Sequence, residues 1–280
     1  MIPRRFFCLM VVLIGLSITA AASISRGASK EYEPQFGQEG KDVVWLPTSQ
    51  TLVDKMLDLA QVTSDDYVID LGSGDGRTVI TAAKRGARAL GIEYNPNLVD
   101  LSERSAVKEG VADKARFIQG DIFESDFSQA TVITMFLLEE INLKLRPRIL
   151  DLKPGTRIVS NSFTMGDWIA DGTATVERKD DCQGVYCTAL LWIVPAKVEG
   201  AWTLPEGELA LTQSFQKIAG ALTSGGSPLP LADAKLEGDR IFFSVGNRRY
   251  VGRVAGGTMQ GTFESEGRTS QWNAMKVVNR

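Results

Sequence analysis

The sequence of 280 residues contains no histidine, and this absence limits the chemistry open to the chain. It excludes a serine–histidine–aspartate triad, a histidine general base and imidazole ligands for a metal ion. Any reaction must rely on carboxylate, lysine, tyrosine or hydroxyl groups, or on positioning of the reactants alone. The sequence therefore identifies no catalytic residue in the narrow sense.

Cysteine is scarce, with only Cys8, Cys182 and Cys187. No two of them form a Cys-x-x-Cys pair, and three are too few for a structural zinc site, so we expect no metal. If the chain is exported, Cys182 and Cys187 would lie in an oxidising compartment, where disulfides persist. Their spacing alone leaves open whether they form a disulfide, because geometry decides it.

The sequence also lacks an excess of positive charge. Its net charge is -3 and its isoelectric point is near 5.3. No overall basic field would attract nucleic acid, and we expect no nucleic-acid partner. With 44% hydrophobic and 23% charged residues, the composition is that of a globular protein with one large or two smaller domains.

The first 30 residues differ in composition from the remainder. Two arginines in MIPRR precede residues 6–24, a run of 19 apolar or small residues. This pattern is typical of an export signal or a membrane anchor, and the length does not decide between cleavage and retention. We expect residues 1–30 to export the chain or anchor it in a membrane, on a side that the sequence does not specify.

From about residue 48 to 163, short β-rich runs alternate with segments of helical periodicity. The expected helices are 48–60, 77–86, 95–110 and 141–152, and the expected strands are 67–71, 87–94, 115–121, 130–137 and 155–163. Residues 172–194 are expected to add two antiparallel strands at the sheet edge. This order predicts an α/β domain over residues 31–195, with a largely parallel sheet, helices on both faces and a ligand beyond the carboxyl ends of the strands.

The last part of the chain has a different pattern. Short alternating segments are separated by glycine-containing turns and show no helical period. We expect a small antiparallel all-β domain over residues 196–280, of unknown role, with Trp202, Tyr250 and Trp272 in its core.

A glycine-rich loop follows the first expected strand, in the stretch VIDLGSGDGRT at 68–78. Its glycines alternate with other residues, so that backbone N–H groups and a helix N-terminus can approach a ligand closely. The spacing does not continue as G-x-G-x-x-G, which excludes the dinucleotide pattern. The candidate ligand-binding residues of this loop are Asp70, Gly72, Ser73, Gly74 and Gly76.

Two further acids end the next two strands. Glu93 lies 19 residues after Gly74, where a carboxylate can accept both hydroxyls of a ribose, and Asp121 can accept an adenine amine. Together with Asp70, these acids suit a nucleoside with a positively charged tail and no phosphate. S-adenosylmethionine fits this description better than NAD.

This combination resembles the class I S-adenosylmethionine-dependent methyltransferases, over residues 42 to about 194. The resemblance implies a Rossmann-like sheet, in which Asp70 and the loop backbone hold the methionine part of the cofactor, Glu93 the ribose and Asp121 the adenine.

Longer stretches on both sides of the loop resemble the ATP synthase c-subunit lysine methyltransferase family and its bacterial relatives. They are DVVWLPTSQTLVDKMLDLA, DLGSGDGRTVITAAKRGARALGIEYNPNLV and TVITMFLLEEINLKLRPRILDLKPGTRIVSNSFTMGDW. The resemblance implies methyl transfer to a lysine of a protein, in or near a membrane. The sequence departs from the family pattern at Val44, Trp45 and Ser49, on the side expected to face the acceptor.

A lysine acceptor must lose its charge before it reacts, and an apolar channel favours this by lowering its pKa. We expect Trp45, Pro47 and Thr48 on one side, and Phe136 and Leu137 on the other, to line such a channel.

Two alternatives remain open at this stage. Cofactor motifs do not specify the acceptor, so it can be a small molecule or a lipid. The export-like segment also allows an exported binding protein that keeps the fold without turnover.

Overall fold

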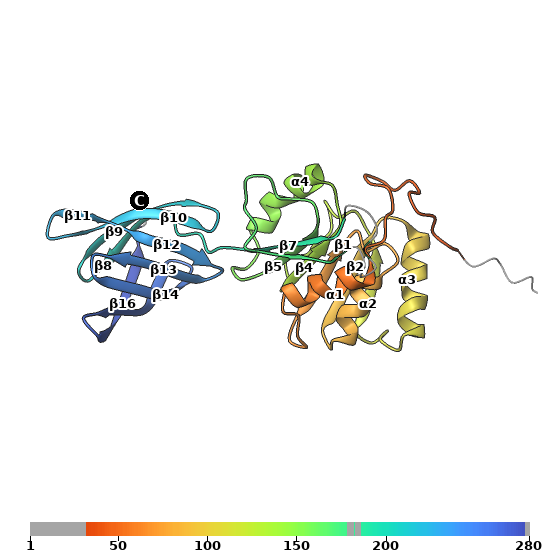
Figure 1. Cartoon of the computed structure of the whole chain (residues 1–280), viewed down its shortest axis with the longest axis horizontal. Helices are drawn as coiled ribbons and strands as arrows, with labels where there is room; N and C mark the ends of the chain where they lie inside the picture. Colours follow the sequence, from red (N-terminus) through yellow and green to blue (C-terminus); the bar gives the residue numbers. More distant parts are fainter. Residues whose placement is uncertain (1–31, 178–181, 183–185, 278–280) are drawn as a thin grey trace, which may run out of the picture. The chain divides into compact units, whose positions relative to one another are not determined.

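The computed structural model describes residues 32–177, 182 and 186–277. The segment 6–24, expected to export or anchor the chain, lies outside these residues. Among the residues that are described, no helix is both long enough and apolar enough to cross a membrane. The fold consists of one mixed α/β sheet followed by one antiparallel sheet (Figure 1).

The first sheet has seven strands in the order β3-β2-β1-β4-β5-β7-β6. Its elements are α1 (Gln50–Leu59), β1 (Tyr67–Leu71), α2 (Arg77–Lys84), β2 (Arg88–Glu93), α3 (Pro96–Lys108), β3 (Ala115–Gln119), β4 (Val132–Met135), α4 (Glu139–Leu150), β5 (Arg157–Asn161), β6 (Gly172–Thr175) and β7 (Thr188–Ile193). Strands β1 to β5 are parallel, and β7 is antiparallel to both β5 and β6. The expected α/β class and the antiparallel pair at the edge are confirmed.

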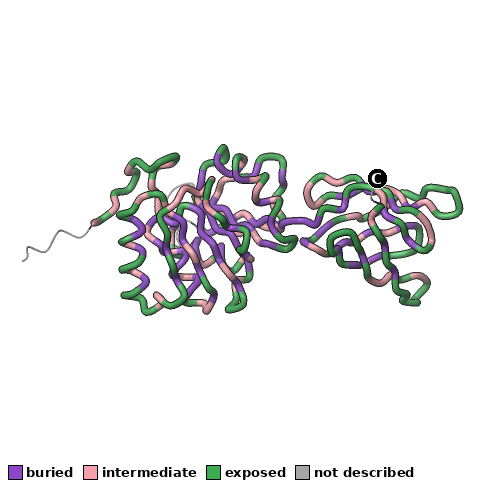
Figure 2. The backbone as a smooth tube through the Cα atoms, turned by 180° about the vertical axis from the view of Figure 1, so that it is seen from behind, coloured by how far each residue is buried: buried purple, intermediate pink, exposed green. Residues whose placement is uncertain are grey.

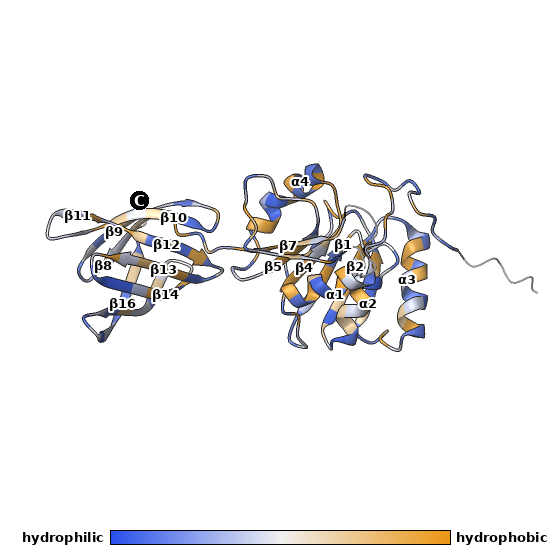
Figure 3. Ribbon diagram, viewed as in Figure 1, coloured by the Kyte–Doolittle hydropathy of each residue, from blue (hydrophilic) through white to orange (hydrophobic). Residues whose placement is uncertain are grey.

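Alternation along the strands creates two buried faces. Val68 and Val132 contribute to a core with α1, α2 and α3, whereas Ile69 and Ile133 contribute to a second core with α4. Because both faces are covered, the central strands β1, β4 and β5 are almost wholly buried (Figure 2), whereas β3 and β6 are partly exposed. The buried residues of the helices are mostly apolar, and hydrophobic and hydrophilic residues alternate along the helices (Figure 3).

The helix boundaries follow local signals in the sequence. Ser49 caps α1, accepting a hydrogen bond from the Leu52 backbone N–H, and Asn95 caps α3 in front of Pro96. Helix α4 begins directly after Leu138, with Glu139 and Glu140 in its first turn, where acids interact favourably with the helix dipole.

The second sheet contains nine antiparallel strands: β8 (Gly200–Leu204), β9 (Gly207–Ser214), β10 (Lys217–Ser224), β11 (Ser227–Pro230), β12 (Ala232–Glu237), β13 (Arg240–Val245), β14 (Arg248–Ala255), β15 (Thr258–Ser265) and β16 (Arg268–Lys276). The consecutive strands β8, β9 and β10 pair in order, and the last strand, β16, pairs with the first, β8, so the pairings close into a barrel. Trp202, Tyr250 and Trp272 are buried inside it, as expected. Side chains therefore fill the interior.

Candidate functional site

A pocket of about 390 Å³ lies at the carboxyl ends of β1, β2 and β4. This is the position at which open α/β sheets bind ligands. Its lining combines the glycine-rich loop, the ends of three strands and the segment 38–48. One end of the pocket is acidic and the other is apolar and aromatic.

The glycine-rich loop turns sharply between β1 and α2. Gly74 has a φ of 56°, and a Cβ atom added there would lie 2.8 Å from Nε1 of Trp45. Glycine is therefore needed both for the backbone conformation and for the close approach of Trp45. Trp45 was expected in the acceptor channel, and the structure places it directly over the loop.

Gly76 has a different role from its two neighbours in the loop. It caps α2 with a φ of 80°, and an added Cβ would lie 2.7 Å from Ser102 and 2.8 Å from Phe117. It does not line the pocket, unlike Gly72 and Gly74. Glycine at position 76 therefore allows the start of α2 to pack closely against α3 and β3. A direct contact between Gly76 and the cofactor stays a prediction.

The carboxylate of Glu93 connects the loop to the end of β2. One of its oxygens accepts a hydrogen bond from the Gly74 N–H at 2.9 Å, and the other accepts one from the Asn95 N–H at 2.9 Å. Each oxygen keeps a second lone pair, which suits the hydroxyls of a ribose. Glu93 thus braces the loop and still has acceptor capacity toward the pocket.

Asp70 is the most perturbed acid in the pocket. It is 6% exposed, and the Thr134 hydroxyl donates a hydrogen bond to it at 2.7 Å. Burial, reinforced by the nearby charges of Glu93 and Asp75, raises the pKa of Asp70 to about 7. A cationic group bound beside it would favour its charged form.

Asp121 lies in the pocket and is already paired. Lys41 donates a hydrogen bond to its carboxylate, as does the Phe123 N–H, and Lys41 also lies over the Tyr94 ring, 5.2 Å from its centroid. The Lys41 ammonium lowers the pKa of Asp121, and the carboxylate raises the pKa of Lys41. Sequence reasoning missed Lys41 because the polar segment before Val43 resembles a linker.

Arg77 ties the glycine-rich loop to the segment that covers it. Its guanidinium forms a two-pronged ion pair with Asp75 and donates a hydrogen bond to the Thr48 carbonyl at 2.8 Å. The guanidinium of Arg77 is therefore already paired within the protein. This pairing suits a ligand without phosphates better than it suits a dinucleotide.

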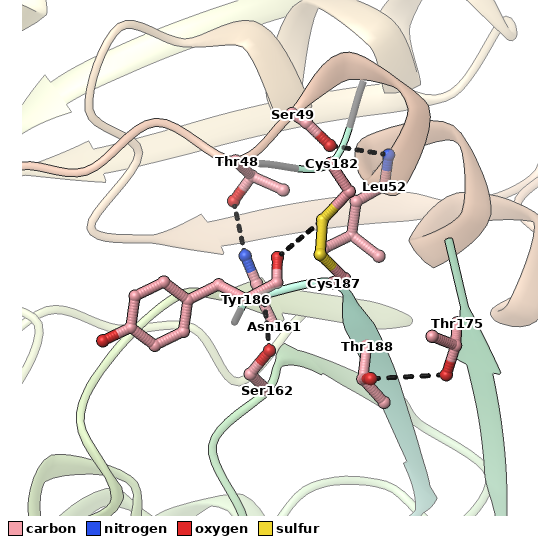
Figure 4. Close-up of a disulfide and its surroundings, with 10 residues drawn as sticks. All are labelled: Thr48, Ser49, Leu52, Asn161, Ser162, Thr175, Cys182, Tyr186, Cys187 and Thr188. Carbon is pink, nitrogen blue, oxygen red and sulfur yellow. Dashed lines mark hydrogen bonds between the residues drawn. A yellow bond between two sulfur atoms is a disulfide. The ribbon is translucent and has the colours of Figure 1, made fainter. Parts of the chain in front are cut away.

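The other end of the pocket is apolar. All five side chains expected in the acceptor channel are among the residues that line the pocket: Trp45, Pro47, Thr48, Phe136 and Leu137. Thr48 is held by Asn161, whose side-chain amide donates a hydrogen bond to the threonine hydroxyl at 3.2 Å (Figure 4).

Two aromatic residues of this end were not expected from the sequence. Phe163 and Tyr186 also line the pocket, and they follow β5 and precede β7 respectively. The position of Phe163 at the end of an expected strand was the available signal. Tyr186 offered none, because it lies within residues 172–194, which were expected only to add two strands at the sheet edge.

Cys182 and Cys187 form a disulfide in the structure (Figure 4). Both are buried, at 2% and 8% exposure, and both belong to the core beneath α1. The question that the spacing left open is thus resolved in favour of a disulfide.

The residues present fit S-adenosylmethionine. The glycines leave room that Cβ atoms would fill, Asp70 can face a cationic amino group, and Glu93 offers two acceptors for a diol. The donors and acceptors match a nucleoside with a sulfonium and an ammonium group.

Comparisons with known proteins agree with this fit. Residues 70–172 match the family model described as the ANTKMT methyltransferase domain. A protein-lysine N-methyltransferase of Saccharolobus islandicus is 44% identical over 147 residues, which cover 51% of this chain and 91% of that protein. The ATP synthase c-subunit lysine N-methyltransferase of Xenopus laevis is 33% identical over 128 residues, which cover 45% of this chain and 56% of that protein.

A solved structure gives the same result for the fold. A protein from Salinibacter ruber, described as an RNA methyltransferase in complex with S-adenosyl-L-homocysteine, superposes with a TM-score of 0.51 at 45% identity. The match covers 55% of this chain and 96% of that one. The sequence identity extends over nearly the whole length of two of these relatives, and it confirms the expected resemblance. The chain belongs to the class I S-adenosylmethionine-dependent methyltransferases, in the family that includes these lysine N-methyltransferases.

Proposed function

We propose that this protein transfers a methyl group from S-adenosylmethionine to the side-chain amine of a lysine in another protein. The observation that supports it most strongly is the 44% identity to a protein-lysine N-methyltransferase over 91% of that relative. The family match over residues 70–172 includes pocket residues from both ends, among them Asp70, Glu93 and Phe136.

The pocket is consistent with this reaction. The acidic end, with Asp70, Glu93 and Asp121, is suited to the cofactor, and the cofactor would supply an electrophilic methyl group on a sulfonium. The apolar end, with Trp45, Phe136 and Leu137, would exclude water from the amine. Desolvation favours the neutral amine, whose lone pair can form the new nitrogen–carbon bond.

The reaction then needs alignment and little acid–base chemistry. As the nitrogen–carbon bond forms, the carbon–sulfur bond breaks and its electrons neutralise the sulfonium; the amine proton leaves to solvent. Holding the two reactants in line in a dry site is the main contribution of the protein. No histidine is required, which agrees with its absence from the sequence.

We also infer that the domain operates outside the reducing cytosol, joined to a membrane or exported through residues 6–24. The Cys182–Cys187 disulfide supports this, because disulfides persist in oxidising compartments. Membrane proteins with accessible lysines would then be the nearest acceptors. The side of the membrane is tested by adding a membrane-impermeant maleimide to intact cells that carry an engineered surface cysteine on the domain. We expect the cysteine to be labelled; a cysteine that is labelled only after cell lysis would place the domain in the cytosol.

The acceptor class is tested by supplying the full-length protein with methyl-labelled S-adenosylmethionine and separate protein, lipid and RNA fractions of cells. We expect label in the protein fraction, and none with Glu93→Ala. Label confined to lipid or RNA would exclude lysine transfer. Calorimetry without detectable cofactor binding would instead indicate a binding protein that has kept the fold without turnover.

A further inference from the structure

Three aromatic rings meet at the apolar end of the pocket. The ring centroids of Phe136 and Phe163 lie 6.1 Å apart, and the Tyr186 ring lies 5.2 Å from Phe136 and 5.6 Å from Phe163. All three residues line the pocket that also contains the glycine-rich loop. We refer to Phe136, Phe163 and Tyr186 as the aromatic triad.

The triad comes from three segments that are far apart in the sequence. Phe136 follows β4, Phe163 follows β5 and Tyr186 precedes β7. Since β5 and β7 are antiparallel neighbours, the end of one strand meets the start of the other. The Ser162 N–H donates a hydrogen bond to the Thr188 carbonyl at 2.7 Å, which brings the residues on either side together.

The segment that carries the Phe163 ring is held from the side of α4. The buried Asn142 side chain donates a hydrogen bond to the Phe163 carbonyl at 3.3 Å. The next residue, Thr164, donates to the Glu139 carboxylate at 2.7 Å. Glu139 lies in the first turn of α4, so this helix is bonded to the residue that follows Phe163.

The third ring depends on the disulfide. Tyr186 directly precedes Cys187, whose sulfur is buried and bonded to Cys182. The Cys187 carbonyl also accepts a hydrogen bond from the Val176 N–H at 2.9 Å, so this backbone is tied to the sheet edge. Figure 4 shows the Tyr186 ring directed away from the two sulfur atoms, while the disulfide holds its backbone.

Aromatic faces attract cations, and several rings together favour alkylated ammonium groups in particular. This chain already uses such contacts at other rings: Lys41 lies over Tyr94, Arg88 over Tyr67 and Arg148 over Phe127. The Tyr186 side chain is 37% exposed, which leaves its ring accessible to an incoming group.

We propose that the aromatic triad binds the alkylammonium group of the incoming acceptor side chain beside the cofactor site, before the amine loses its proton and reacts, and that the Cys182–Cys187 disulfide holds Tyr186 in place as its third wall. This rests on the proposed lysine transfer for its biological role. The binding site itself is a property of the three rings and can be tested without turnover.

The experiment uses two probes of equal shape with the full-length protein saturated with S-adenosylhomocysteine. One probe is N-acetyl-trimethyllysine amide, which is cationic; the other is its neutral analogue with a tert-butyl group in place of the trimethylammonium. We expect calorimetry to show that the cationic probe binds roughly threefold to tenfold more tightly, as cation–π attraction would produce.

Substitutions locate the effect. Tyr186→Phe should retain the preference for the cation, and Tyr186→Leu should reduce it at least twofold, because Phe keeps the aromatic face and Leu does not. Phe242→Leu, in the second sheet, is the matched control and should leave the preference unchanged. Equal affinity of the wild type for both probes would overturn the proposal.

The disulfide is tested with the double variant Cys182→Ala/Cys187→Ala and with wild-type protein treated with a thiol reductant. Both should weaken cation binding at least twofold while the affinity for S-adenosylhomocysteine stays the same. Unchanged cation binding in both would show that the disulfide does not hold Tyr186. If the protein prefers the cationic probe but methylates no lysine, the aromatic triad is supported as a cation site and the proposed lysine transfer is overturned.

Discussion

The Glu93 carboxylate holds the backbone of Gly74, with 2.9 Å between the carboxylate oxygen and the amide nitrogen. The residue that we expect to receive the ribose therefore also shapes the loop that receives the methionine part. A change at Glu93 should affect both parts of the cofactor site at once.

We predict that Glu93→Ala weakens S-adenosylmethionine binding by roughly 10-fold to 100-fold, the loss expected for hydrogen bonds to a charged group. Glu93→Gln keeps one side-chain acceptor and should lose less. Calorimetry at equal protein concentrations measures both. Equal affinity of Glu93→Ala and wild type would remove Glu93 from the site.

Asp70 makes stability and cofactor binding depend on pH in opposite ways. Its pKa is raised from 3.8 to about 7 in the folded protein, chiefly by burial. Its contribution to stability is fully present below pH 4 and is lost as the pH rises through 7, because the folded state disfavours the charged form. Asp70→Asn cannot ionise, so it should be more stable than wild type above pH 7, by up to about 4 kcal/mol.

The same group should couple cofactor binding to proton release. A cationic amino group beside Asp70 favours the carboxylate, so affinity for S-adenosylmethionine should rise as pH increases from 6 to 8. Asp70→Asn should bind more weakly and lose this dependence. Thermal unfolding and calorimetry across that range measure both effects, and a pH-independent affinity in the wild type would contradict the assignment.

Gly74→Ala tests the contact between the loop and Trp45. Alanine at a φ of 56° costs about 1 kcal/mol of backbone strain, and its Cβ would also crowd the indole at 2.8 Å. We expect loss of measurable cofactor binding and a drop in stability. Gly225→Ala is the matched control, since Gly225 has a φ of 62° with nothing within 4 Å of an added Cβ. An equal loss of stability in both variants would show that Trp45 is not crowded.

The Lys41–Asp121 pair should compete with adenine for the Asp121 carboxylate. Lys41→Met is expected to strengthen S-adenosylmethionine binding only modestly, by up to about fivefold, because solvent weakens an ion pair near the surface. Asp121→Asn should weaken binding. Weaker binding by Lys41→Met would indicate that Lys41 itself contacts the cofactor.

The sequence predicts the α/β fold well because its strongest signals are local. Ser49 at a helix start, Pro96 in a first turn and glycines after a buried strand each act through their own backbone. The acids Asp70, Glu93 and Asp121 could be placed in one pocket because they lie at the ends of expected parallel strands, which meet at the same sheet edge. The closed barrel was expected only as an antiparallel domain, because closure depends on the pairing of β16 with the distant β8 rather than on alternation.

Contacts between distant segments could not be predicted in the same way. The pairing of Lys41 with Asp121 joins residues 80 positions apart, and no pattern in the polar segment indicates it. Tyr186 lines the pocket because it directly precedes β7, which runs antiparallel to β5, and its neighbour Cys187 belongs to the disulfide. Such residues depend on the tertiary fold, which a single sequence does not specify directly.

The most direct test of lysine transfer is amino-acid analysis of the methylated acceptor. The full-length protein is incubated with methyl-labelled S-adenosylmethionine and cell membranes, and the labelled protein band is hydrolysed to free amino acids. We predict that the label elutes with methylated lysine, and that Glu93→Ala gives none. Label on any other amino acid, or an equal yield with Glu93→Ala, would contradict the central claim.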